Sequence, residues 1–198
     1  MASPDGRRPG VPDGGTGVVP RTDGPLTVSP TLSPMPTLER LRADHAEALL
    51  AFEHENREYF ARTVPDRGDE YFTPAGFAAR HQALLAEQDA GICHFHVVLD
   101  VEGRLVGRIN LMDVEDGSAE LGYRVGELAS GKGVATAAVA EMCRMAATAY
   151  GLTSLVAVTT LDNAGSRTVL ERNGFVTLGE TTVGGRPGIR YRREHLGH

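Results

Sequence analysis

A short glycine-rich segment, Gly131-Lys132-Gly133, lies between a predicted strand and a long predicted helix. Glycine tolerates positive φ angles, so successive backbone N–H groups can turn toward one ligand. The helix that follows adds unpaired N–H groups and the positive end of its dipole. Because these features bind phosphate, we interpret the segment as an anion site. The alternative is an ordinary strand-to-helix turn.

A nucleotide-binding loop is one interpretation of this anion site. Gly126 to Lys132 nearly matches G-x-x-x-x-G-K-[ST], but Gly133 stands where a hydroxyl would hold Mg²⁺. Asp162 follows a buried strand, as in such enzymes, yet it fits a turn equally well. Nucleotide loops also usually follow an early parallel strand, whereas this loop follows a predicted antiparallel meander. The sequence therefore does not favour an NTPase.

The elements that must position this loop are predicted from apolar periodicity and from turn residues. The predicted strands cover 37–41, 92–100, 104–114, 119–125, 155–160, a stretch after Gly174-Phe175, and 189–193. The predicted helices cover about 44–60, 77–87, 134–150 and 163–173. An antiparallel meander followed by strand, helix and strand predicts a mixed α/β (α+β) fold around one sheet.

Proline is concentrated at the start of the chain, since eight of the 11 prolines lie in residues 1–36. This stretch has six glycines and no aromatic residue, so it cannot bury enough apolar surface to offset the entropy of ordering. We predict a flexible leader over residues 1–36 and one folded domain over residues 37–198.

The composition of the chain disfavours several classes of protein. The 198 residues are 41% hydrophobic with a net charge of −6, which disfavours a nucleic-acid binder that needs a broad basic surface. No apolar run is long enough for a membrane span, and the start lacks the pattern of a secretory signal. Cys93 and Cys143 form no disulfide framework and are predicted to be inert. We therefore expect a cytoplasmic protein with no membrane partner.

Two motifs resemble those of the GNAT acyltransferase superfamily. Ser130 to Ala135 (SGKGVA) resembles its acetyl-CoA pyrophosphate loop, R/Q-x-x-G-x-G/A. Asn163 to Ser166 (NAGS), followed by Gly174-Phe175, resembles its N-x-x-A/S…G-F motif. The intervals between the motifs also match. The stretches 119–123 and 56–60 are similar to the RimJ/RimL-like branch, the ribosomal-protein N-terminal acetyltransferases.

The resemblance implies a fold, a co-substrate and site residues. The fold would be a GNAT fold, with a single central, mostly antiparallel sheet that is splayed in the middle and flanked by helices. The co-substrate would be acetyl-CoA, with no metal. The residues implied in its binding are Tyr123, Val125, Ser130, Gly131, Lys132, Gly133, Val134, Ala135, Asn163 and Ser166.

The sequence departs from the family pattern at two positions. Ser130 replaces the usual Arg or Gln, which removes a side-chain contact but leaves the backbone cradle. Leu170 stands where other branches have a tyrosine general acid, which excludes that acid. Ser166 fills a position where the RimJ/RimL-like branch commonly has serine, and it could donate a proton to the departing thiolate. The alternative for Ser166 is a small packing residue.

Glu120 is the predicted catalytic base. Acetyl transfer requires a neutral amine, so a group must take the proton of the alkyl ammonium. Glu120 lies on the strand before the loop and alternates with Gly122 and Arg124. The alternatives for Glu120 are a solvated strand residue and an ion-pair partner of Arg124. Asn163 would hydrogen-bond the pantetheine arm, cap the short helix, or do both.

The sequence offers several candidate residues for the acceptor site. Asn56, Arg57 and Tyr59 could line the acceptor site, or they could belong to an amphipathic helix that covers the sheet. His94 and His96 share a strand face, but a metal site needs three or four ligands. We expect both histidines to be hydrogen-bonded near the acceptor cleft, where one could assist as a base.

The sequence therefore predicts an acetyl-CoA-dependent N-acetyltransferase whose acceptor is a primary amine, either a protein N-terminus or a small molecule. The alternative is a non-catalytic acyl-CoA-binding regulatory module on the same fold. A homodimer through an edge strand or the final hairpin is a further expectation.

Overall fold

A computed structural model describes residues 35–196. The predicted leader, apart from Met35 and Pro36, lies outside these residues. The described chain contains a seven-stranded sheet in the order β1-β2-β3-β4-β5-β7-β6. Its strands are β1 (Thr37–Arg40), β2 (His94–Leu99), β3 (Leu105–Glu115), β4 (Ser118–Val125), β5 (Ser154–Thr160), β6 (Val176–Val183) and β7 (Arg186–Glu194). All neighbouring strands are antiparallel except β4 and β5.

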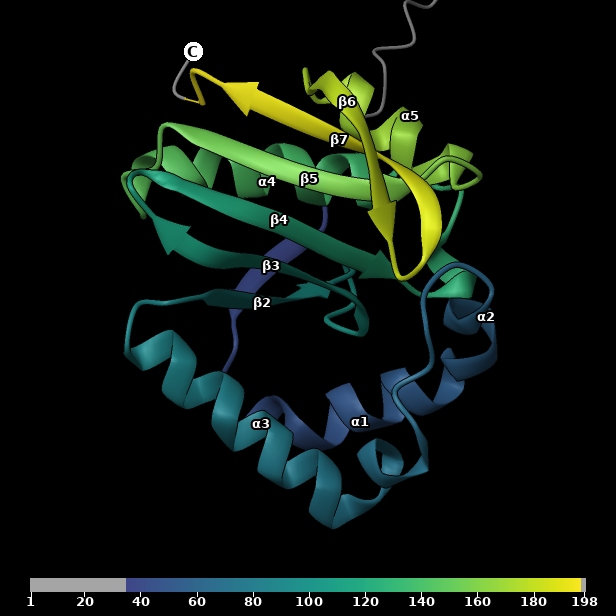
Figure 1. Cartoon of the computed structure of the whole chain (residues 1–198). Coiled ribbons are helices and arrows are strands. Elements are labelled where there is room, and N and C mark those ends of the chain that lie inside the picture. The colour runs from purple at the N-terminus through teal and green to yellow at the C-terminus, as the bar shows by residue number, and fades with distance from the viewer. Residues whose placement is uncertain (1–34, 197–198) are drawn as a thin grey trace, which may run out of the picture. The chain divides into compact units, whose positions relative to one another are not determined.

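Helices cover both faces of the sheet (Figure 1). The helices are α1 (Ala46–Glu55), α2 (Arg57–Ala61), α3 (Pro74–Asp89), α4 (Val134–Thr148) and α5 (Ala164–Arg172). Three short 3₁₀ turns are η1 (Ala43–His45), η2 (Asp69–Phe72) and η3 (Glu127–Ala129). The mixed architecture predicted from the element order is therefore confirmed.

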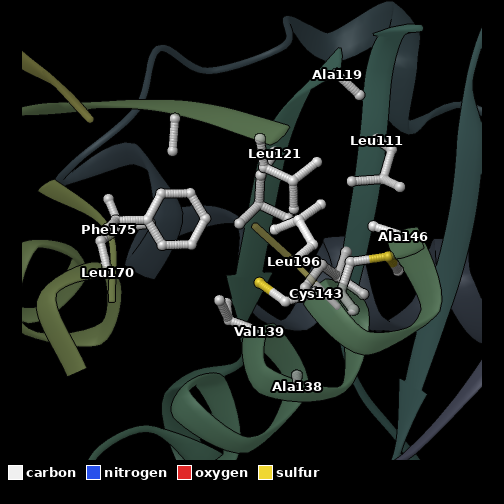
Figure 2. Packing of buried hydrophobic residues seen from close by; sticks show 14 of the residues in the cluster. Leu111, Ala119, Leu121, Ala138, Val139, Cys143, Ala146, Leu170, Phe175 and Leu196 are labelled. Atoms are coloured by element: carbon white, nitrogen blue, oxygen red, sulfur yellow. The ribbon is translucent and has the colours of Figure 1, made fainter. Parts of the chain in front are cut away.

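One apolar core lies between the sheet and α4. Val139, Cys143 and Ala146 recur on one face of α4 and pack against Leu111 and Leu121 of the central strands (Figure 2). A second core, which includes Phe52, Phe77 and Val97, lies between the sheet and α1 to α3. Because strand side chains alternate, successive residues of the central strands face opposite cores.

The pairing of β4 with β5 is short. The two strands are in register only from Ser118 to Glu120 and from Ser154 to Val156. Beyond Glu120 they separate, and β4 continues to Val125 paired with β3 alone. Figure 1 shows the two strands diverging. The sheet is thus splayed in its middle, as the resemblance implied.

Two helix boundaries differ from the prediction. The single helix expected over about 44–60 is interrupted at Asn56, where φ is −104° and ψ is 6°. The α3 helix begins at Pro74 rather than Phe77, because the Thr73 side chain accepts the Gly76 N–H and proline occupies the first turn. The Thr-Pro pair was the available sequence signal for this earlier start.

Candidate functional site

The glycine loop connects β4 to α4. Gly131 and Gly133 have φ angles of 73° and 81°, the left-handed conformation for which the sequence analysis required glycine. An added Cβ would meet nothing within 4 Å at either position, so φ alone requires glycine there. The Ala137 N–H is bonded to the Gly133 carbonyl, whereas helix geometry gives the N–H groups of the first turn before Ala137 no partner within the helix. These N–H groups and the adjoining loop could hold a phosphate.

Helices α1 and α2 support this loop. The Asn56 side chain accepts the Glu127 N–H at 2.8 Å and donates to the Phe52 carbonyl at 2.9 Å. The Tyr59 hydroxyl donates to Ser130 Oγ at 3.0 Å. The structure therefore brings Asn56 and Tyr59, which were predicted as acceptor contacts, against the loop. Their part in acceptor binding stays a prediction.

A hollow of about 820 Å³ borders the loop. Its lining includes Gly126, Lys132 and Val134 from the loop region, Phe52 from α1, and Val106 from β3. Glu120 does not line this hollow. The predicted base therefore lies outside this hollow, at the point where β4 and β5 separate.

Glu120 faces the α1 side of the sheet. Its neighbours Ala119 and Leu121 point into the α4 core, so alternation directs Glu120 to the opposite face. Partial burial raises the pKa of Glu120, nearby Asp113 raises it further, and Arg190 opposes the shift. A carboxylate with a raised pKa can accept a proton from an amine nucleophile. Arg124 is not its partner, because Arg124 pairs with Glu53 at 3.2 Å.

Tyr123 and Ser166 meet on the opposite face of β4. The Tyr123 hydroxyl lies 3.0 Å from Ser166 Oγ and 3.2 Å from the Ser166 carbonyl. Burial raises the pKa of Tyr123 to about 12, so the phenol keeps its proton at neutral pH. Asn163 caps α5, since its side chain accepts the Ser166 N–H at 3.1 Å. Strand alternation predicts that the Tyr123 side chain lies opposite Glu120, but its contact with Ser166, 43 positions away, had no local sequence signal.

Arg57 holds the loop that follows α2. It donates to Asp66 at 2.9 and 2.6 Å and to Asp69 at 2.7 Å, and its guanidinium lies 4.2 Å from the centroid of the Phe72 ring. Arg57 thus positions the segment that contains Arg67 and Tyr71. Its predicted contact with an acceptor stays a prediction.

The two histidines of β2 are hydrogen-bonded or stacked, but the expectation that they lie near the acceptor cleft was wrong. His94 stacks on Tyr150 with ring centroids 3.7 Å apart, and His96 Nε2 lies 2.8 Å from the Tyr150 hydroxyl. Val97 faces the α1-side core, so alternation directs both histidines toward the C-terminal end of α4. The described residues contain no group of three potential metal ligands.

Comparison with known proteins supports the assignment of the fold. Residues 37–176 match the family description "Acetyltransferase (GNAT) domain". The chain is 30% identical over 141 residues to the probable N-acetyltransferase YjcK of Bacillus subtilis (strain 168), covering 68% of this chain and 77% of that protein.

Solved structures share the fold. The ribosomal-protein-S5-alanine acetyltransferase from Vibrio fischeri is 22% identical, with a TM-score of 0.75 over 80% of this chain and 92% of that one. RimJ from Mycobacterium smegmatis, solved with CoA-disulfide, is 25% identical, with a TM-score of 0.73 over 79% of this chain and 80% of that one. Within residues 35–196, no helix has the length and apolar character that crossing a bilayer requires. The chain belongs to the GNAT acetyltransferase family, and it is an N-acetyltransferase.

Proposed function

We propose that the protein transfers the acetyl group of acetyl-CoA to a primary amine, with Glu120 as the base. The observation that carries this proposal is the separation of β4 from β5 directly after Glu120. It leaves one edge of β4 unpaired from Leu121 to Val125, and the glycine loop follows at the end of that strand. A linear ligand with a phosphate at one end fits this arrangement.

The chain offers groups for each part of acetyl-CoA. Backbone N–H groups from Ser130 to Ala135 would hold the pyrophosphate, and Lys132 adds a positive charge at the same loop. The unpaired edge of β4 at Tyr123 and Val125 would bind the pantetheine arm through backbone hydrogen bonds. Asn163 would contribute its remaining amide donors from the start of α5.

The reaction removes two protons from the acceptor nitrogen and supplies one to the departing thiolate. Glu120, directly or through a water molecule, takes a proton from the ammonium of the acceptor. The neutral nitrogen attacks the thioester carbon, so that an N–C bond forms and the C–S bond breaks. Ser166, hydrogen-bonded to Tyr123, gives a proton to the departing thiolate and is reprotonated from solvent, while Glu120 returns its proton to solvent. The proton lost from nitrogen during the attack passes to solvent.

The acceptor is an amine of a protein N-terminus or of a small molecule. The similar Vibrio fischeri enzyme acts, by its name, on an alanine of a ribosomal protein. That likeness, together with the RimJ structure, supports a protein N-terminus for this chain. The same fold serves other acceptors, so the likeness alone does not decide the substrate.

The test measures CoA release and product mass with acetyl-CoA and a panel of amines and N-terminal peptides. Glu120→Gln should lower kcat roughly 10²- to 10⁴-fold while leaving the affinity for acetyl-CoA unchanged. Glu115→Gln, an exposed strand carboxylate, is the matched control and should retain full activity. Acetyl-CoA binding without turnover for any acceptor would favour the non-catalytic acyl-CoA-binding module instead.

A further inference from the structure

Three arginines gather on the face of the sheet that carries Glu120. Arg108 of β3 and Arg124 of β4 are cross-strand partners and point to the same side. Each lies 3.2 Å from Glu53 of α1, Arg108 through Nε and Arg124 through Nη1. Arg67, from the loop after α2, lines one small hollow together with Glu53 and Arg124, and its charge lowers the pKa of both other arginines. We call Arg67, Arg108 and Arg124 the arginine cluster.

The arginine cluster carries more positive charge than its surroundings neutralise. Glu53 is 1% exposed and is the carboxylate paired with both Arg108 and Arg124. The contact of Arg108 Nε with Glu53 lacks hydrogen-bond alignment, and Arg67 Nε is buried with no hydrogen-bond partner among the described residues. The nearby Asp66 and Asp69 are bound to Arg57. An anionic ligand would provide a partner for such buried donors.

Aromatic rings lie against two members of the arginine cluster. The Arg124 guanidinium lies 4.8 Å from the centroid of the Phe60 ring, and that of Arg67 lies 4.6 Å from the centroid of Tyr71. The hollow among Glu53, Arg67 and Arg124 is about 10 Å³, which is too small to enclose a carboxylate. An anion would therefore bind at its mouth, and Arg67 can turn toward it because no ion pair holds its side chain in the described chain.

The arginine cluster lies at a fixed interval from the proposed base. Glu120 and Arg124 are four residues apart on the same face of β4, which corresponds to roughly 13 Å along a strand. An extended peptide covers that distance in three to four residues. Arg190, which lowers the pKa of Glu120, adds a further positive charge near the base.

We infer that the acceptor amine carries a carboxylate that binds the arginine cluster while its nitrogen lies at Glu120. This inference rests on the proposed function and names the substrate class of the same site. The best fit is a peptide N-terminus with Asp or Glu at its second to fourth position. Polyamines and basic N-termini would be poor acceptors, because bringing like charges together is unfavourable.

The test compares C-terminally amidated peptides that differ only in having Asp, Asn or Lys at positions two to four. The parent enzyme should prefer the acidic peptide over the basic one by roughly tenfold or more in kcat/KM, since an arginine–carboxylate hydrogen bond is of that strength. A dipeptide with a free C-terminal carboxylate, compared with its amide, tests whether a small amino acid derivative supplies the anion. Equal rates for the acidic and basic peptides, or a preference for the basic one, would overturn the inference.

Two variants test whether the arginine cluster is responsible. Arg67→Gln should bring the ratio of acidic to neutral kcat/KM toward one, and Arg67→Glu should reverse the preference toward basic peptides. Arg144→Gln, an exposed arginine on α4, is the matched control and should keep the parent ratio. An unchanged ratio in Arg67→Glu, with a melting temperature like that of the parent, would refute the assignment.

A binding measurement distinguishes a failure of this inference from a failure of the proposed function. N-acetylated forms of the same peptides cannot react, so calorimetry measures their affinity without turnover. Tighter binding of the acidic form, weakened by added salt, supports the arginine cluster even if no acceptor is acetylated. Acetylation of all peptides at equal rates would instead leave the proposed function standing and remove the inference.

Discussion

Replacing Glu53 by glutamine tests the balance of charge beneath the proposed acceptor site. Glu53 is 1% exposed and pairs with Arg108 and Arg124 at 3.2 Å each. The Glu53→Gln change keeps the shape of the side chain but removes the carboxylate that pairs with both arginines. Both guanidinium groups then remain largely buried, with 12% and 19% of their side chains exposed, and lack that ion-pair partner.

The expected loss of folding stability follows from the burial of these two arginines. Removing one partner of a buried ion pair typically destabilises a protein by about 3–5 kcal/mol. For a domain of this size each kcal/mol lowers the melting temperature by roughly 2–4 °C, so the variant should melt roughly 6–20 °C below the parent. Urea unfolding at neutral pH gives the free energy of unfolding. Glu55→Gln, the same change at an exposed position of α1, should stay within about 0.5 kcal/mol of the parent.

Anions offer a second measurement on the same variant. With Glu53 gone, sulfate should raise the melting temperature of Glu53→Gln more than that of the parent, because the arginines then lack their internal counter-charge. A free energy of unfolding within about 1 kcal/mol of the parent would show that the arginines do not depend on Glu53. That result would refute the reasoning from burial and would also weaken the arginine cluster as a charged site.

Four further outcomes are expected. Burial lowers the pKa of His96 from 6.5 to about 4, so the unfolded chain takes up a proton at a higher pH than the folded protein does. The free energy of unfolding should therefore be fully retained above pH 6.5 and should fall by up to about 3 kcal/mol as the pH drops toward 4. Urea titrations would measure this loss, which should be absent in His96→Gln. The raised pKa of Glu120 means that its charge opposes folding at neutral pH, so Glu120→Gln should melt higher than the parent, and parent activity should fall as pH drops through that pKa. Gly133→Ala forces a Cβ to adopt a φ of 81°, which should cost about 1–2 kcal/mol in stability and weaken CoA binding in calorimetry. Tyr123→Phe removes the hydrogen bond to Ser166 and should lower kcat with little change in the KM for acetyl-CoA.

The glycine loop could be predicted from sequence because its conformation is local. Positive φ at Gly131 and Gly133 and the start of α4 depend on residues next to one another in the chain. The cap at Asn163 was predictable for the same reason. The interruption of the first helix at Asn56 was not, because its cause is the Glu127 N–H, 71 positions away in sequence.

The arginine cluster could not be predicted because its members come from separate elements. Strand alternation correctly placed Glu120 and Arg124 on one strand face, which made an ion pair between them one of the alternatives. The actual partner of Arg124 is Glu53, on a helix that crosses that face. Strand alternation likewise could not indicate which face of β2 meets α4, and this is why His94 and His96 were placed near the acceptor cleft.

Strand β4 brings the two halves of the proposed reaction together because its two faces carry different chemistry. The face toward α1 holds Glu120 and Arg124, a proton acceptor and a charged anchor. The face toward α5 holds Tyr123, whose hydroxyl meets Ser166. In an unbroken sheet these faces would be isolated from each other. The separation of β5 after Glu120 opens the edge of β4, so a thioester lying along that edge would be accessible to the base from one face and to the proton donor from the other.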